Sequence, residues 1–159
     1  MTPFHIFLAV LVAVIWGIAF VATKIGLESF SPPQLTALRF LIASVPVVLV
    51  ARPPITWPVL GAVGLTLFAG QFLFQFFGIA NGMPPGLASI VVQTQAFFTI
   101  LFAGLALGEK PTRRQLSGTA VAFAGLAVIA VTVGHDLTTV GLCLTAMSAI
   151  SWGIGNVLV

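Results

Sequence analysis

The stretch from Pro53 to Gly108 reads PPITWPVLGAVGLTLFAGQFLFQFFGIANGMPPGLASIVVQTQAFFTILFAGLALG. Its 56 residues include no Asp, Glu, Lys or Arg, and the nearest charges on either side are Arg52 and Glu109. A helix needs about 20 apolar residues to cross the hydrocarbon core of a bilayer. The stretch is therefore long enough for two crossings, which we expect at about residues 57–80 and 87–107, with a turn at Asn81–Gly86 between them.

The composition of the whole chain points the same way. Of its 159 residues, 59% are hydrophobic and 6% are charged, whereas a typical soluble domain carries about 25% charged residues. Six basic and three acidic side chains cannot cover a soluble fold, and the hydrophobic content excludes a disordered chain. The net charge of +3 comes without a basic stripe, which excludes nucleic-acid binding. The class that remains is an integral membrane protein, with the lipid bilayer as its first partner.

Four more apolar runs of similar length flank the central stretch, and prolines or charges bound them. Near-continuous runs of about 20 residues indicate helices, because the strands of a membrane barrel have about ten residues of alternating polarity. We therefore predict an all-α integral membrane protein with six transmembrane helices, at about residues 4–23, 34–50, 57–80, 87–107, 115–133 and 138–159.

The basic residues of the short loops predict how these helices are oriented, because cytoplasmic loops carry an excess of Lys and Arg. With the N-terminus inside, the outer side of the membrane holds only Lys24 and Arg39. The inner loops then hold Arg52, Lys110, Arg113 and Arg114. We expect a cytoplasmic N-terminus, with the loop after the fourth helix as the main topology signal.

A short internal repeat links the first and last predicted helices. Ala13, Trp16, Gly17 and Ile18 recur 136 positions later as Ala149, Trp152, Gly153 and Ile154. A repeat of five helices is odd in number, so the two copies enter the membrane from opposite sides, as in inverted-repeat transporters. We predict a first repeat over residues 4–133 and the start of a second over residues 138–159. Because residue 159 lies inside the sixth predicted helix, we expect an N-terminal fragment of a longer protein.

Three segments carry a family resemblance: WGIAFVATKIG at residues 16–26, PPQLTALRF at residues 32–40, and GLASIVVQTQAFFTI at residues 86–100, which leads to GEK at residues 108–110. They resemble the EamA-type branch of the drug/metabolite transporter superfamily, and the third is similar to the O-acetylserine/cysteine exporter group in particular. The resemblance implies a non-enzymatic transporter with ten helices in two inverted five-helix EamA repeats. Such a protein exports small metabolites across the bacterial inner membrane, and alternating access is the expected mechanism. A complete path would then need the missing second repeat or a second copy of this chain.

Export of a small polar metabolite needs polar groups inside an apolar bundle, and the glutamines are the first candidates. Gln71 and Gln75 lie four residues apart, on one face of the third predicted helix. Each amide offers two donors and an acceptor, so the pair either binds substrate or bridges helices. In the fourth predicted helix, Ser89 and Gln93 form a polar stripe that we expect to line the cavity. Gln95 lies about 200° around the helix from Gln93, so we expect it at a helix interface.

The two repeat-related tryptophans, Trp16 and Trp152, lie in the middle of their predicted helices rather than at the headgroup level where Trp is enriched. They are expected either to form a wall of the substrate cavity or to fill space between helices, where Gly17 and Gly153 allow close approach. Asn156, one turn beyond Trp152, is a further candidate for the cavity.

Arg39 lies about 10 Å below the start of its predicted helix, at 1.5 Å per residue. A charge at the bilayer centre costs about 3 kcal/mol, and less near a helix end. The sequence leaves two uses open for this side chain. It forms an ion pair with Glu28 at the outer face, or it attracts a carboxylate of the substrate.

The chain lacks the motifs of membrane-embedded enzymes and pumps. His5 and His135 are its only histidines, it has neither an H-E-x-x-H motif nor a P-loop, and no Asp or Glu lies within a predicted span. We therefore predict no catalytic residue, no metal and no cofactor. Two alternatives to the exporter stay open: a half-size transporter that acts as an antiparallel homodimer, and a non-transporting membrane scaffold or pseudogene product.

Overall fold

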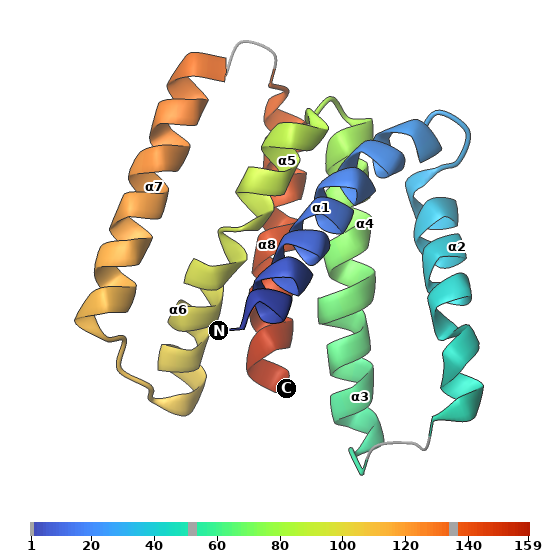
Figure 1. The fold of residues 1–159 in the computed structure, drawn as a ribbon, viewed down its shortest axis with the longest axis horizontal. Helices are drawn as coiled ribbons and strands as arrows, with labels where there is room; N and C mark the ends of the chain where they lie inside the picture. Colours follow the sequence, from blue (N-terminus) through green and yellow to red (C-terminus); the bar gives the residue numbers. More distant parts are fainter. Residues whose placement is uncertain (1, 51–53, 134–136) are drawn as a thin grey trace.

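The computed structural model of the chain describes residues 2–50, 54–133 and 137–159. Within these ranges the chain folds into helices joined by short turns, with no strand, as expected (Figure 1). The elements are α1 (Pro3–Gly26), α2 (Pro32–Ser44), the 3-10 segment η1 (Val45–Leu49), α3 (Trp57–Val63), the π-helical segment η2 (Gly64–Gly70), α4 (Gln71–Ala80), α5 (Pro85–Val92), α6 (Gln95–Leu107), α7 (Arg113–Val133) and α8 (Thr139–Leu158).

Local sequence signals explain where several helices begin and end. Proline stands at the first position of α1, α2 and α5, where its missing N–H costs nothing. At the start of α2, the side-chain Oε1 of Gln34 accepts hydrogen bonds from both the main-chain N–H and the hydroxyl of Ser31. Helix α6 ends at Gly108, whose φ of 70° lies in the left-handed region that favours glycine.

Helix α8 lies at the centre of the bundle and packs chiefly against α4 and α6 (Figure 1). Close backbone approach makes this packing possible. A Cβ atom at Gly153 would lie 2.6 Å from the Cβ of Phe98 on α6, and one at Gly155 would lie 3.0 Å from the Cα of Leu67. Interfaces of this kind favour glycine in membrane helices, because association there depends on van der Waals contact and interhelical hydrogen bonds.

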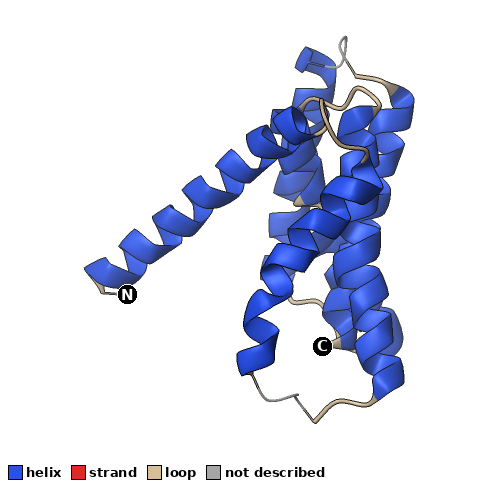
Figure 2. Ribbon diagram, turned by 90° about the vertical axis from the view of Figure 1, so that its right-hand side faces the viewer, coloured by secondary structure: helices blue, strands red, loops and turns tan. Residues whose placement is uncertain are grey.

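Helix α1 leaves the bundle toward its N-terminus, so that its first half stands apart from the other helices (Figure 2). Its later half packs against α4 and α5, where Ile79, Met83 and Ala88 form a buried cluster that Phe20 contacts. Thr23 is the only buried residue of α1. The N-terminal half of α1 therefore presents an apolar surface that no described residue covers.

Four helices of the described ranges are long and apolar enough to cross a membrane: Pro3–Gly26, Trp57–Ala80, Pro85–Leu107 and Thr139–Leu158. Each overlaps one of the predicted spans. The count of six spans and the inverted-repeat arrangement stay predictions. Helices α1 and α8 run in opposite senses along the bundle (Figure 1).

The helices differ in detail from the expected spans. The α-helical part of the second span ends at Ser44 rather than near residue 50, because Pro46 cannot donate a main-chain hydrogen bond; a 3-10 turn continues to Leu49. The fourth span is broken at Gln93 and Thr94 rather than continuous. At this break the main-chain N–H of Thr94 donates to the carbonyl of Val91, three residues back, and so does its hydroxyl, at 2.7 Å.

Candidate functional site

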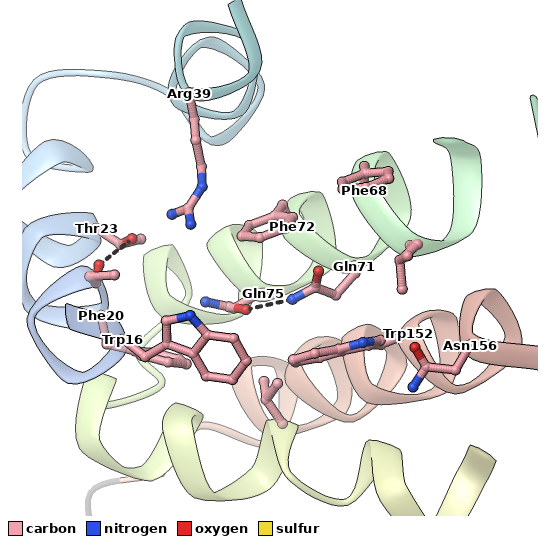
Figure 3. Close-up of a pocket in the computed structure, with 13 residues that line it drawn as sticks. Trp16, Phe20, Thr23, Arg39, Phe68, Gln71, Phe72, Gln75, Trp152 and Asn156 are labelled. Atoms are coloured by element: carbon pink, nitrogen blue, oxygen red, sulfur yellow. Dashed lines mark hydrogen bonds between the residues drawn. The ribbon is translucent and has the colours of Figure 1, made fainter. Parts of the chain in front are cut away.

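The segments α3, η2 and α4 form one helix, Trp57–Ala80, which we call the α3–α4 helix. A cavity of about 290 Å³ opens between α1, α2, the α3–α4 helix and α8 (Figure 3). Its volume is at the lower end of the range for small-molecule sites, about 300 Å³. The lining is mainly aromatic, with a few polar groups: Trp16, Ala19, Phe20, Thr23, Arg39, Leu67, Phe68, Gln71, Phe72, Gln75, Val92, Trp152 and Asn156. Six of these residues, Trp16, Arg39, Gln71, Gln75, Trp152 and Asn156, were singled out from the sequence alone.

The two glutamines of α4 face this cavity together. Gln71 and Gln75 are each 5% exposed, and Nε2 of Gln71 donates a hydrogen bond of 3.3 Å to Oε1 of Gln75. The bond lies within one helix, so the pair does not bridge two helices. Directly before Gln71 the helix is π-helical from Gly64 to Gly70. Such segments occur often at functional sites, where they change the direction in which side chains point.

Trp16 of α1 and Trp152 of α8 meet at the cavity wall. Their ring centroids lie 6.1 Å apart, with the ring planes at 62°, an edge-to-face geometry that aromatic pairs favour. Residues 136 positions apart in the chain thus come into contact, and both face the glutamine pair across the cavity (Figure 3). The tryptophans form a wall of the cavity in addition to packing two helices together.

Arg39 extends from α2 to the mouth of the same cavity. Its guanidinium carbon lies 4.5 Å from the ring centroid of Phe72, a cation–π distance. Within the described ranges no ion pair joins Arg39 to Glu28, although that pair was one of the two expectations from the sequence. In the described part of the chain the guanidinium of Arg39 thus lines the cavity, and its pairing with Glu28 stays a prediction.

Asn156 joins the cavity to the interface between α6 and α8. Its Nδ2 donates hydrogen bonds to Oε1 of Gln95, at 2.9 Å, and to the hydroxyl of Thr99, at 3.0 Å. Gln95 thus lies at a helix interface, as the helical geometry indicated. Asn156 therefore lines the cavity from α8 and also links α8 to α6.

Two other candidates lie elsewhere. Gln93 faces a second cavity, of about 470 Å³, between the α5–α6 region and α7. The hydroxyl of Ser89 donates to the carbonyl of Gly86, at 2.6 Å, and Ser89 is not part of the lining that Gln71 and Gln75 share. Ser89 and Gln93 were expected to line a cavity together, but neither is part of the lining around Gln71 and Gln75, and only Gln93 is part of the second lining.

The charged loop residues lie far from the first cavity. Lys110, Arg113 and Arg114 are exposed at the end of the bundle where α6 stops and α7 begins (Figure 1). Arg52 and His135 lie outside the described residues. Within those residues, no three His, Cys, Asp or Glu side chains gather as ligands for a metal ion.

The sequence reasoning missed the apolar part of the lining. Phe68 and Phe72 lie three residues before Gln71 and one residue after it, and Phe20 lies one turn after Trp16. Their helical spacing from the predicted polar residues was the one signal that could have identified them. The residue type alone gives none, because a phenylalanine in a membrane helix can face lipid, protein or a cavity.

Comparison with known proteins identifies the family. The family model for the EamA-like transporter family matches residues 3–131. The chain belongs to this family. As a member of the EamA-like family, it is a multi-pass membrane protein related to transporters.

Several named relatives align with nearly all of this EamA-like chain. The chain is 44% identical over 154 residues to a "Probable amino-acid metabolite efflux pump" of Salmonella typhimurium, an alignment that covers 95% of this chain and 52% of the relative. It is 42% identical over 153 residues to a protein of the same name in Escherichia coli, with 94% and 51% covered. A "Probable terminal-alkyne amino-acid exporter" of Streptantibioticus cattleyicolor is 31% identical over 152 residues, with 91% and 51% covered. The chain spans about half the length of these relatives, and no solved structure matches it.

Proposed function

We propose that this chain is the first half of a metabolite exporter of the bacterial inner membrane, and that the cavity around Gln71 and Gln75 holds the substrate. The observation that carries the proposal is the convergence of a buried amide pair, two tryptophans and a free guanidinium in one cavity of an EamA-like protein. Buried amides cost free energy in an apolar bundle unless they find partners. A polar substrate supplies such partners.

The proposed substrates are small amino-acid-type metabolites, with O-acetylserine and cysteine as the first candidates. The relatives with 42–44% identity are named amino-acid metabolite efflux pumps. The cavity suits this class, because its volume admits a small molecule and its amides can exchange hydrogen bonds with polar groups. The aromatic side chains around them can cover the apolar part of such a molecule.

Alternating access is the proposed mechanism, with the cavity opening in turn to each side of the membrane. Two features of the fold favour it. The helix that carries the glutamines is π-helical at its middle, and the neighbouring span is broken at residues 93–94. Irregular backbone inside a membrane bundle is typical of transporter sites, where it lines a cavity and allows helices to bend. We place the N-terminus in the cytoplasm and expect the second repeat, or a second copy, to complete the path.

Efflux measurements test this function. Cells that express the gene encoding this chain are loaded with labelled O-acetylserine or cysteine, and release is followed over time. We expect faster release than in control cells, and a loss of about tenfold when Gln71 or Gln75 is replaced by Leu, because a buried hydrogen-bonding group contributes about 1–3 kcal/mol.

A matched substitution locates the site. Gln93→Leu makes the same change in a residue that faces the second cavity, so it should leave efflux within twofold of the unmodified protein. Loss of efflux with Gln93→Leu but not with Gln71→Leu would move the site to the second cavity. Release equal to that of control cells for every compound would contradict export by this chain alone or by two copies of it. The same result with the second repeat present would favour a non-transporting membrane protein.

A further inference from the structure

Three nitrogen donors from three helices face the same part of the first cavity. They are the guanidinium of Arg39 on α2, Nε2 of Gln75 on α4 and the indole N–H of Trp16 on α1 (Figure 3). The three residues lie up to 59 positions apart in the chain, so the fold alone brings them together. A cluster of donors is a different kind of site from an amide pair, which offers donors and acceptors alike.

Each of these donors is available to a ligand. Oε1 of Gln75 already accepts the hydrogen bond from Gln71, which turns Nε2 of Gln75 away from its neighbour and toward the cavity. The guanidinium of Arg39 is held over the ring of Phe72 and forms no ion pair within the described ranges. The indole nitrogen of Trp16 likewise has no hydrogen-bond partner among the described residues.

The lining offers little to balance these donors. None of the thirteen described lining residues is Asp or Glu, and Arg39 is the only one of the thirteen that carries a charge. The hydroxyl hydrogen of Thr23 is already bonded to the carbonyl of Ala19, at 2.8 Å. The remaining side-chain acceptors are the neutral amide oxygens of Gln71 and Asn156, whereas an anion with several acceptor lone pairs would meet the guanidinium, the amide N–H and the indole N–H together and would also balance the positive charge.

We propose that Arg39, Gln75 and Trp16 form a subsite for the carboxylate of the transported molecule. A carboxylate suits it in charge and in geometry, because its two oxygens match the fork of an arginine and leave lone pairs for further donors. The rest of the molecule then lies against Trp152 and the phenylalanines. The inference rests on the proposed function, since it assigns one end of the substrate within the same cavity.

Tryptophan fluorescence tests the subsite directly, because two of the three tryptophans line the cavity. Trp57→Phe removes the third, at the start of α3. The purified chain in lipid nanodiscs is titrated with O-acetylserine and with its carboxamide, which differ only in the carboxylate. We expect the acid to bind at least tenfold more tightly than the amide.

Substitutions of Arg39 test whether this residue causes the tighter binding of the acid than of the amide. Arg39→Gln should weaken binding of the acid roughly 10- to 100-fold, the scale of a hydrogen bond to a charged group, and should remove the preference over the amide. Arg39→Lys should restore part of the affinity, because it keeps the charge and loses the fork. Lys24→Gln is the matched control, since it removes a positive charge from α1 outside the cavity, and it should change affinity less than twofold.

The possible results distinguish a failure of the carboxylate subsite from a failure of the proposed exporter function. Equal affinity for acid and amide, an unchanged affinity in Arg39→Gln, or an equal loss in Lys24→Gln would overturn the carboxylate subsite while leaving the exporter in place. Binding of neither compound would overturn both, because the cavity would then not be a substrate site. The comparison of acid with amide uses the chain with its full cavity lining, so it does not depend on whether an Arg39 variant folds.

Discussion

The hydroxyl of Ser151 on α8 donates a hydrogen bond of 2.8 Å to the main-chain carbonyl of Thr66, a residue 85 positions earlier within the π-helical segment. The same carbonyl also accepts a hydrogen bond from the main-chain N–H of Gln71, five residues on, in the π-helical pattern. Ser151 therefore adds a second hydrogen bond to this carbonyl, from the central helix. The bond thus holds the irregular part of the glutamine-bearing helix against α8.

Replacing Ser151 by Ala should lower the free energy of unfolding by about 0.5–1.5 kcal/mol, the range of interhelical hydrogen bonds in membrane proteins. Thermal unfolding in detergent measures the change. Ser117→Ala serves as the control, because the Ser117 hydroxyl donates only to the carbonyl of Arg114 on its own exposed helix. Equal effects of the two substitutions would contradict a special role for the bond between Ser151 and Thr66.

Two glycine substitutions, which we expect to change the free energy of unfolding in different ways, test the packing of α8. Gly153→Ala places a Cβ 2.6 Å from the Cβ of Phe98, so it should destabilise the fold by about 1–3 kcal/mol. Gly118→Ala meets no atom within 4 Å on α7 and should be neutral or stabilise by up to about 1 kcal/mol. The same unfolding measurement checks both. A neutral Gly153→Ala would mean that α8 and α6 are farther apart in the membrane.

A double-mutant cycle tests the contact between Asn156 and Gln95. Each is replaced by Leu singly and then together, and unfolding free energies are compared. We expect a coupling of about 0.5–2 kcal/mol, because the two amides share a hydrogen bond of 2.9 Å across a helix interface. Strictly additive effects would show that the two side chains do not interact in the membrane-embedded protein.

The wall formed by Trp16 and Trp152 should limit the size of the transported molecule. Trp152→Ala removes the indole ring that contacts Trp16 and so enlarges the cavity. The rate of phenylalanine efflux relative to that of O-acetylserine should therefore rise by about tenfold. Trp152→Phe keeps an aromatic ring and should shift the ratio by less than about threefold. An unchanged ratio in both variants would assign the tryptophans to helix packing alone.

The parts of the fold and the site that depend on helical periodicity could be predicted from the sequence. The 3.6-residue period placed Gln71 and Gln75 on one face, and the structure has both in one cavity. The same period put Gln95 on a different face from Gln93, and the two residues do point to different neighbours. The first of these predictions needs only the geometry of a single helix, whereas Gln93 and Gln95 lie on either side of the break between α5 and α6.

The rest depended on contacts between distant helices or on local breaks in a helix. Nothing in the sequence links Asn156 to Gln95, because 61 residues separate them. Proximity in sequence suggested Glu28 as the partner of Arg39, whereas the structure has Arg39 over Phe72, a residue of another helix. The turn at Gln93 and Thr94 was hidden, because neither proline nor glycine stands beside it in the sequence.

The π segment from Gly64 to Gly70 affects where the α3–α4 helix can lose a residue. A π turn contains about one residue more than an α turn, because its hydrogen bonds join residues five apart. Deleting one residue within the segment would therefore let it close as α turns, with the two amides still near their present face. In an α-helical turn, where successive residues are about 100° apart, the same deletion would rotate everything after it by about that angle. A deletion between Gln71 and Gln75 would thus separate the two amides, whereas one in the π segment is expected to be tolerated better.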